Sequence, residues 1–193
     1  MDLKNFCIGF GITGSYCTVE KVFSVIQNLV DLKAHVIPVF SNSLENANTR
    51  FGCSEEWKDR IETITGEKTL NSIVEVEPLG PQNALDVMVI APCTGNTMAK
   101  LARGITDNAV LMCAKLAFRN QKPVIVAIST NDGLGINAIS LGYLLNYKNL
   151  YLVPFGQDDP FRKPNSLIAN MEDLIPTLIS ALNNKQMQPL LKS

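Results

Sequence analysis

The chain has 193 residues, of which 46% are hydrophobic and 18% charged. This composition supports one globular domain with a sizeable core and excludes extensive disorder. The 17 basic and 18 acidic residues nearly cancel, which gives no electrostatic reason to expect binding to nucleic acid or to an acidic membrane. Apolar runs are short and no secretory signal pattern begins the chain, so we expect a cytoplasmic protein without a membrane span.

Strand and helix patterns alternate along the chain, which predicts an α/β, Rossmann-like three-layer domain with a mainly parallel sheet. We expect strands over residues 5–10, 35–40, 72–77, 85–91, 122–128 and 150–153. We expect helices over residues 17–33, 44–49, 54–64, 67–71, 96–103, 107–118, 136–146 and 171–184. We expect residues 1–193 to form this single domain, with a polar turn over residues 156–160 and a frayed tail over residues 185–193.

Three single residues refine these expectations. Pro38 interrupts the hydrogen-bonding pattern of the second strand, which favours a place at the sheet edge. Pro176 predicts a kink in the last helix. Asp107 is a plausible N-cap for the helix that follows it.

The five cysteines are odd in number and contain no CxxC pair, and His35 is the only histidine. These features favour reduced thiols and give no metal site. Cys93 lies in a suspected ligand loop, where we expect it to pack or to line the site and not to act as a nucleophile. His35 lies at the start of its strand, so it should be at the edge of the sheet opposite to the ligand loops.

A glycine-rich turn follows the first strand. Residues 9–15 match the pattern Gly-x-Gly-x-x-Gly between a strand and a helix, where glycines let backbone amides approach a phosphate. The start of the following helix adds partial positive charge. Gly11, Thr13, Gly14 and Ser15 are therefore candidate phosphate contacts, and the alternative is a tight turn that binds nothing.

A whole NAD would require an acidic residue at the end of the second strand, to bind the ribose hydroxyls. Ser41 occupies that position and Glu45 follows too late. The pattern therefore favours a mononucleotide phosphate over NAD. The hydroxyls of Ser41 and Ser43 could donate hydrogen bonds to the phosphate or to a sugar-alcohol chain.

Two further polar loops follow apolar strands. Thr94, Gly95, Asn96 and Thr97 come directly after the strand that begins near residue 85, and they exceed what a helix cap needs, although a cap is the simpler alternative. Residues 129–133 follow the next strand and form a candidate substrate loop, unless they are only a surface turn. Both loops should lie at the edge where open α/β sheets bind ligands.

Residues 91–97 and 104–108 resemble the flavoprotein family of FMN-binding cysteine decarboxylases, and the similarity extends over residues 3–183. This resemblance implies a flavodoxin-like fold. It implies that FMN binds through its phosphate at the glycine-rich turn and at the two serines that follow the second strand, and that the loop containing Asn96 borders the isoalloxazine ring. Asn131 would then contact the substrate. The family's active-site histidine is replaced here by residues 77–80, so decarboxylation is not expected.

Residues 120–123, 127–132 and 153–160 extend the resemblance to family members that are oxidoreductase subunits. The implied role is to oxidise a small dihydropyridine together with a partner subunit that binds NADP. The implied setting is the mother-cell cytoplasm of a sporulating bacterium, and relatives suggest a homo-oligomer. A non-catalytic partner of that subunit and an FMN-dependent decarboxylase remain alternatives, and no residue can be named as the catalytic base.

Overall fold

Seven strands form the central sheet of the computed structural model, which describes residues 3–192. The strands are β1 (Cys7–Ile12), β2 (His35–Phe40), β5 (Val87–Cys93), β6 (Val124–Thr130), β7 (Leu150–Leu152), β8 (Phe155–Asp159) and β9 (Lys163–Ala169). They are arranged in the order β2-β1-β5-β6-β9-β8, and β7 also pairs with β6. Strands β2, β1, β5, β6 and β7 are parallel, whereas β9 runs antiparallel to β6 and to β8.

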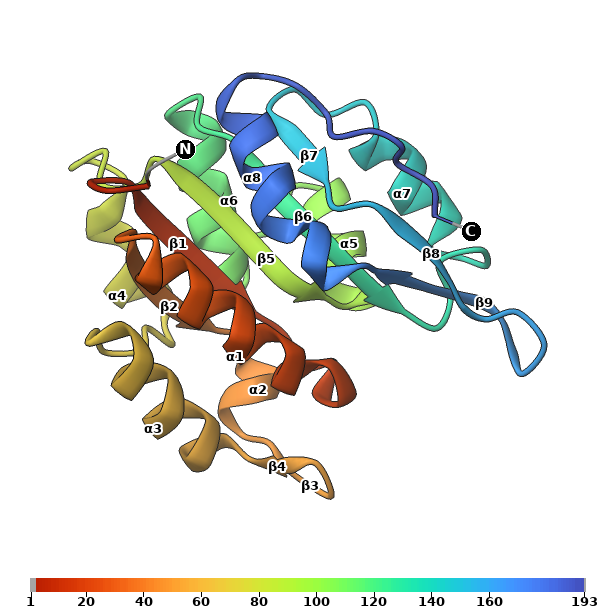
Figure 1. The fold of residues 1–193 in the computed structure, drawn as a ribbon, viewed down its shortest axis with the longest axis horizontal. Coiled ribbons are helices and arrows are strands. Elements are labelled where there is room, and N and C mark those ends of the chain that lie inside the picture. Colours follow the sequence, from red (N-terminus) through yellow and green to blue (C-terminus); the bar gives the residue numbers. More distant parts are fainter. Residues whose placement is uncertain (1–2, 193) are drawn as a thin grey trace.

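Helices cover both faces of this sheet. The helices are α1 (Tyr16–Asp31), α2 (Asn42–Glu45), α3 (Ser54–Thr65), α4 (Ile73–Val76), α5 (Gly95–Ala102), α6 (Ala109–Arg119), α7 (Ala138–Leu144) and α8 (Leu174–Leu182). Figure 1 shows α1 and α8 in front of the sheet and α5, α6 and α7 behind it. Short 3₁₀ turns (Glu77–Leu79 and Met171–Asp173) and a small hairpin, β3 (Asn48–Thr49) and β4 (Gly52–Cys53), complete the fold. The predicted three-layer α/β class is confirmed.

The strand order places a ligand crevice between β1 and β5. The chain proceeds from β1 to one side of the sheet and from β5 to the other, and open α/β sheets bind ligands at such a reversal, beyond the carboxyl ends of the strands. Both strands are almost wholly buried. Gly11 lies within β1, and an added Cβ would stand only 2.7 Å from Cγ1 of Val110 on α6. Its lack of a side chain therefore lets α6 pack closely on the sheet.

Two predictions for residues 67–77 are wrong. Residues 72–77 do not form a strand, because Ser72 is the N-cap of helix α4 and shares a capping box with Glu75. That local hydrogen bonding outweighs the β-branched residues of the segment. Residues 67–71 are not helical: Leu70 instead forms a parallel bridge with Val39.

The polar turn predicted over residues 156–160 is also wrong, because this segment is the first arm of the β8–β9 hairpin. Asp159 shapes the turn, since its Oδ1 accepts hydrogen bonds from the amides of Phe161 and Arg162. The frayed tail expected over residues 185–193 falls partly outside the described residues, and Lys192, the last residue described, lies against this hairpin. The amide of Lys192 donates to the carbonyl of Phe155 at 2.9 Å.

Smaller differences concern the ends of elements. Asn108, not Asp107, caps α6 through a hydrogen bond from the amide of Leu111. Pro176 lies in the first turn of α8, where its missing amide hydrogen is not needed, so no kink is required. The loop predicted over residues 129–133 begins only at residue 131, because β6 extends to Thr130. Pro38 does lie on an edge strand, as predicted.

Candidate cofactor and substrate site

A cavity of about 790 Å³ opens at the carboxyl edge of β1, β5 and β6. Its volume falls within the range of about 300–1,000 Å³ that is typical of small-molecule sites. Six residues predicted as ligand contacts line it: Gly14, Ser15, Thr94, Gly95, Asn96 and Asn131. The structure thus brings the three predicted loops to one place. Five predicted contacts are not part of the lining: Gly11, Thr13, Ser41, Ser43 and Thr97.

Thr13 links the turn after β1 to the turn after β5 by hydrogen bonds beneath the cavity. Its buried hydroxyl donates to the carbonyl of Pro92 at 2.7 Å and accepts from the amide of Thr94 at 3.0 Å. Thr97 has a comparable supporting role, because its amide and hydroxyl both bond the hydroxyl of Thr94, which caps α5. Both threonines shape the loops from below.

Ser41 and Ser43 lie on the β2 side of the glycine-rich turn. Their hydroxyls share a hydrogen bond of 3.0 Å. A Cβ added to Gly14 would stand 2.9 Å from Oγ of Ser43, so this glycine allows the turn to approach the serines. Tyr16 joins the same group through a hydrogen bond from its hydroxyl to the carbonyl of Ser43.

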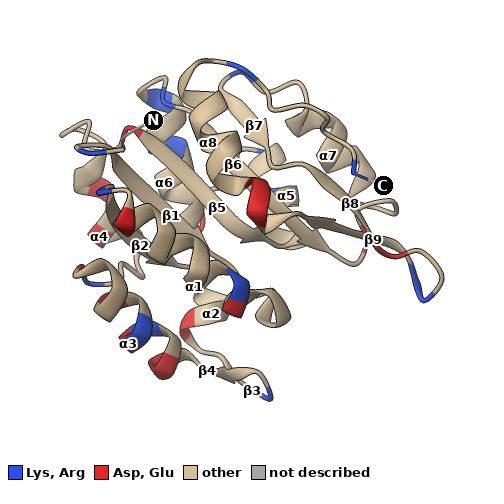
Figure 2. Cartoon of the chain, viewed as in Figure 1, with Lys and Arg blue, Asp and Glu red and all other residues tan. Residues whose placement is uncertain are grey.

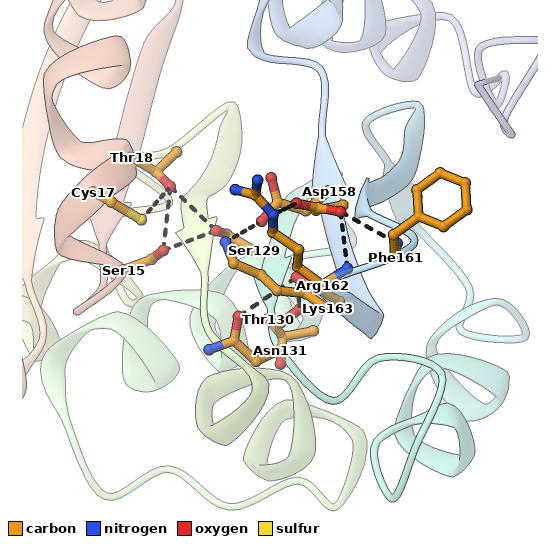
Figure 3. Close-up of polar contacts among 12 residues, drawn as sticks. Ser15, Cys17, Thr18, Ser129, Thr130, Asn131, Asp158, Phe161, Arg162 and Lys163 are labelled. Carbon is orange, nitrogen blue, oxygen red and sulfur yellow. Dashed lines mark hydrogen bonds and ion pairs between the residues drawn. The ribbon is translucent and has the colours of Figure 1, made fainter.

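A cluster of three hydroxyls lies at the floor of the cavity, where α1 meets β6 (Figure 3). Ser15 and Ser129 share a hydrogen bond of 2.8 Å, and Thr18 lies 3.2 Å from both hydroxyl oxygens. No side chain caps the start of α1. The amides of Ser15 and Thr18 already bond backbone carbonyls, so the amides of Tyr16 and Cys17 are the ones available to an anion, which the positive end of the helix attracts.

The loop after β6 is organised around one carboxylate. Asp132 accepts hydrogen bonds from the hydroxyl of Thr130 and from the side-chain amide of Asn137. An added Cβ on Gly95 would stand 2.7 Å from Oδ1 of Asp132. Glycine is thus required where the turn after β5 contacts the turn after β6. Asn131 precedes the carboxylate and accepts a hydrogen bond from Ser166 on β9 at 3.5 Å.

Besides Asp132 of the predicted loop, four charged side chains line the cavity that no sequence pattern predicted there: Lys21, Arg50, Asp158 and Lys163. Figure 2 shows one basic residue at the tip of the β3–β4 hairpin and charges of both signs on the β8–β9 hairpin. Both hairpins are remote in sequence from the three loops. Only the tertiary structure brings their charges to the mouth of the cavity.

Neither His35 nor Cys93 lines the cavity. His35 pairs with Glu67, with 2.8 Å between Nε2 and Oε1, and it begins β2 beside Cys7 at the start of β1. This position is the opposite edge of the sheet, as predicted. Cys93 is fully buried, and burial raises the pKa of its thiol to about 12, so it is a packing residue.

Residues 3–192 contain neither a group of side chains that could hold a metal ion nor a helix that could span a membrane. In this part of the chain no three His, Cys, Asp or Glu side chains are grouped so that they could hold a metal ion. None of the helices described there is long and apolar enough to span a membrane.

Comparison with known proteins defines the class of this protein. The profile of the protein family described as Flavoprotein matches residues 1–150, and the chain belongs to this family. Over 190 residues it is 52% identical to the B subunit of dipicolinate synthase from Bacillus subtilis, an alignment that covers 98% of this chain and 95% of the relative.

Solved structures agree with this assignment. The crystal structure of the dipicolinate synthase B subunit from Bacillus halodurans superposes with a TM-score of 0.92 at 48% identity, covering 100% of this chain and 99% of the other. The FMN-dependent cysteine decarboxylase SpaF gives a TM-score of 0.69 at 20% identity, covering 93% and 98% of the two chains. At that identity the likeness concerns the fold.

The residues at the cavity fit a flavin mononucleotide on physical grounds. The uncapped start of α1, the hydroxyl of Ser15 and the approach allowed by Gly14 suit a dianionic phosphate. Lys21 and Arg50 add positive charge at the same cavity. The amide side chain of Asn96 offers both donors and acceptors to the polar edge of a flat ring.

Proposed function

We propose that this protein works as the B subunit of a dipicolinate synthase. It would act with a nicotinamide-binding A subunit to oxidise dihydrodipicolinate to dipicolinate during sporulation, in the cytoplasm of the mother cell and as a homo-oligomer. The cavity would hold FMN or a related phosphate ligand. The observation that carries the proposal is the uncapped start of α1, which opens into a cavity shared with the loops that contain Asn96 and Asn131.

The reaction removes a hydride and a proton from the dihydropyridine ring. The hydride would finally reach NADP⁺ on the partner subunit, so each dipicolinate formed yields one NADPH and one proton. A bound flavin supplies a hydride-accepting ring. The chain itself would bind and orient the reactants.

Each part of the cavity has a distinct role in this proposal. Gly14 and Ser15 would hold the phosphate, with Thr13 fixing their turn against the loop that begins at Thr94. The side chain of Asn96 would border the ring and set its position. Asn131 would face the substrate, and its Oδ1 lies 3.5 Å from the hydroxyl of Ser166 on β9.

A second role, as a non-catalytic partner of the A subunit, has one specific observation in its favour. Both carboxylate oxygens of Asp132 accept hydrogen bonds, and Asp158 is paired with Lys163 at 2.6 Å. The carboxylates of the cavity are therefore engaged, and the histidine is remote. Decarboxylation is disfavoured for the same reason.

Titration with FMN tests the cofactor proposal. We expect the purified protein to bind FMN with a change in the visible absorbance of the flavin, and Ser15→Asp to abolish binding because its carboxylate repels the phosphate. Ser24→Asp is the matched control, since this exposed residue lies further along α1. If wild-type protein gives no spectral change, or if both variants behave alike, FMN does not bind at this cavity.

Assays of each subunit alone and of the two together test the reaction. We expect dipicolinate, measured by chromatography, and NADPH, measured by absorbance, to form at full rate only when both subunits are present. Full turnover by the A subunit alone would exclude an essential catalytic role for this protein. Equal rates with FMN-free and FMN-loaded protein would favour the non-catalytic role.

A further inference from the structure

The basic side chains that line the cavity differ in whether they form an ion pair with a carboxylate. Among the residues that the structure describes, Lys21 and Arg50 form no ion pair, and Arg50 stacks on the ring of Phe51. Lys163 instead pairs with Asp158, with 2.6 Å between Nζ and Oδ2. Lys163 thus already holds a carboxylate at the mouth of the cavity.

We propose that Lys163 is a specificity-determining residue, which binds one of the two ring carboxylates of the substrate in exchange for Asp158. This inference rests on the proposed function, because it takes the substrate to be a pyridine-type dicarboxylate. It assigns to the β8–β9 hairpin the recognition of the acidic group that distinguishes this substrate from monocarboxylates.

The position of Lys163 is the first argument. Figure 3 shows its side chain extending from β9 toward the side of the cavity formed by Ser15 and Ser129. It begins the same strand that carries Ser166, whose hydroxyl bonds the carbonyl of Thr130 and the side chain of Asn131. Lys163 and the proposed substrate contact Asn131 therefore belong to one hydrogen-bonded part of the cavity wall.

The state of the ammonium group is the second argument. The hydrogen bond and the charge of Asp158 raise the pKa of Lys163 above its ordinary value, so the group stays positive at any physiological pH. Its side chain is about half exposed, at 53%, and the ion pair is open to solvent. Exposed ion pairs contribute little stability, so a ligand carboxylate can displace Asp158 at small cost.

The division of charge among the ligands is the third argument. The proposed cofactor phosphate has its own partners at the start of α1, together with Lys21 on that helix. A dicarboxylate substrate brings two further negative charges. A charge-assisted hydrogen bond to Lys163 would neutralise one of them at the hairpin.

Arg162 provides a matched control in the same turn. Its side chain is 89% exposed, its Nε lies 3.9 Å from Oδ2 of Asp159, and it does not line the cavity. A general effect of positive charge on the hairpin would involve both residues. A specific contact inside the cavity would involve Lys163 alone.

Calorimetry with the intact protein, with and without added FMN, tests the inference. Dipicolinate and picolinate, which lacks one carboxylate, are the probes, and Lys163→Met and Arg162→Met are the variants. We expect wild-type protein to prefer dipicolinate over picolinate by up to about fivefold, the upper end for an ion pair that stays open to solvent. Lys163→Met should lose this preference and keep its affinity for FMN, and Arg162→Met should match the wild type.

Four results would overturn the inference: no binding of dipicolinate to wild-type protein, unchanged preference in Lys163→Met, equal loss in both variants, or loss of FMN affinity in Lys163→Met. The last result would assign Lys163 to the phosphate. Unchanged far-ultraviolet circular dichroism would establish that the variants are folded. If the wild-type protein does not bind FMN, the cofactor proposal is overturned. The affinities for dipicolinate and picolinate can still be compared, because they are also measured without FMN.

Discussion

Gly95→Ala is the substitution with the sharpest structural consequence at the cavity. Gly95 is the first residue of α5, and the position of a Cβ there would overlap the hydroxyl of Thr130. The same Cβ would stand 2.7 Å from Oδ1 of Asp132 and 2.8 Å from Nδ2 of Asn137. One added methyl group would therefore clash with the three hydrogen-bonded side chains that hold the loop after β6 in place.

The magnitude follows from two opposing effects. Overpacking a close contact costs about 1–3 kcal/mol, whereas replacing a helical glycine by alanine gains at most about 1 kcal/mol. Because three atoms lie closer than 3.0 Å to the added Cβ, the upper part of the overpacking range applies, about 2–3 kcal/mol, and we expect a net loss of about 1–2 kcal/mol in the free energy of unfolding. For a chain of this size, each kcal/mol lowers Tm by about 2–4 °C.

Gly142→Ala is the control, because an added Cβ on this residue of α7 meets nothing within 4 Å. It should stabilise the protein by about 0.5–1 kcal/mol through helix propensity alone. Urea unfolding followed by circular dichroism measures both variants, and FMN titration measures whether the loop has moved. If Gly95→Ala were as stable as the wild type and bound FMN equally well, the close contact between the two loops would be refuted.

The sequence predicted the sheet and the ligand edge because these depend on local patterns. Apolar runs marked β1, β5 and β6, and helical spacing marked α1 and α6. Alternation of strands and helices predicts that the strands are parallel. The carboxyl ends of parallel strands meet at one edge of the sheet, where ligands bind. The three loops around Ser15, Asn96 and Asn131 could be found in this way.

The β8–β9 hairpin could not be predicted from its own residues. Charged and proline residues over residues 156–164 suggest an exposed turn, and the strands form because β9 pairs with the end of β6. The segment over residues 72–77 shows the converse case. Its β-branched residues suggest a strand, but the capping box at Ser72 starts a helix. Pairing partners and caps decide these segments, and neither is visible in hydrophobic periodicity.

Several predicted contacts serve the architecture of the site. Gly11 makes room for α6, and Thr13 links two loops from below. A phosphate-loop pattern combines residues that touch a ligand with residues that shape the turn, and spacing alone does not separate the two. The basic side chains that line the cavity were not predicted from the sequence, for a different reason. Lys21 and Lys163 lie on elements that meet only in the folded protein.

Three further predictions depend on which side chains are buried. Thr13→Val removes the hydroxyl that bonds Pro92 and Thr94, and the unpaired buried partners should cost about 1–3 kcal/mol of unfolding free energy; a loss below about 0.5 kcal/mol in urea unfolding would contradict this assignment. Iodoacetamide at pH 8 should label the exposed Cys17 in the native protein and spare Cys93, as read by mass spectrometry, with all five thiols labelled after denaturation. Because burial raises the pKa of Cys93 from 9.0 to about 12, the unfolded chain ionises this thiol first. The stability from the neutral buried thiol is present below pH 9 and falls as the pH rises from 9 toward 12. Cys93→Ala should flatten this alkaline decline, and an unchanged slope would mean that the thiol is not held neutral by burial.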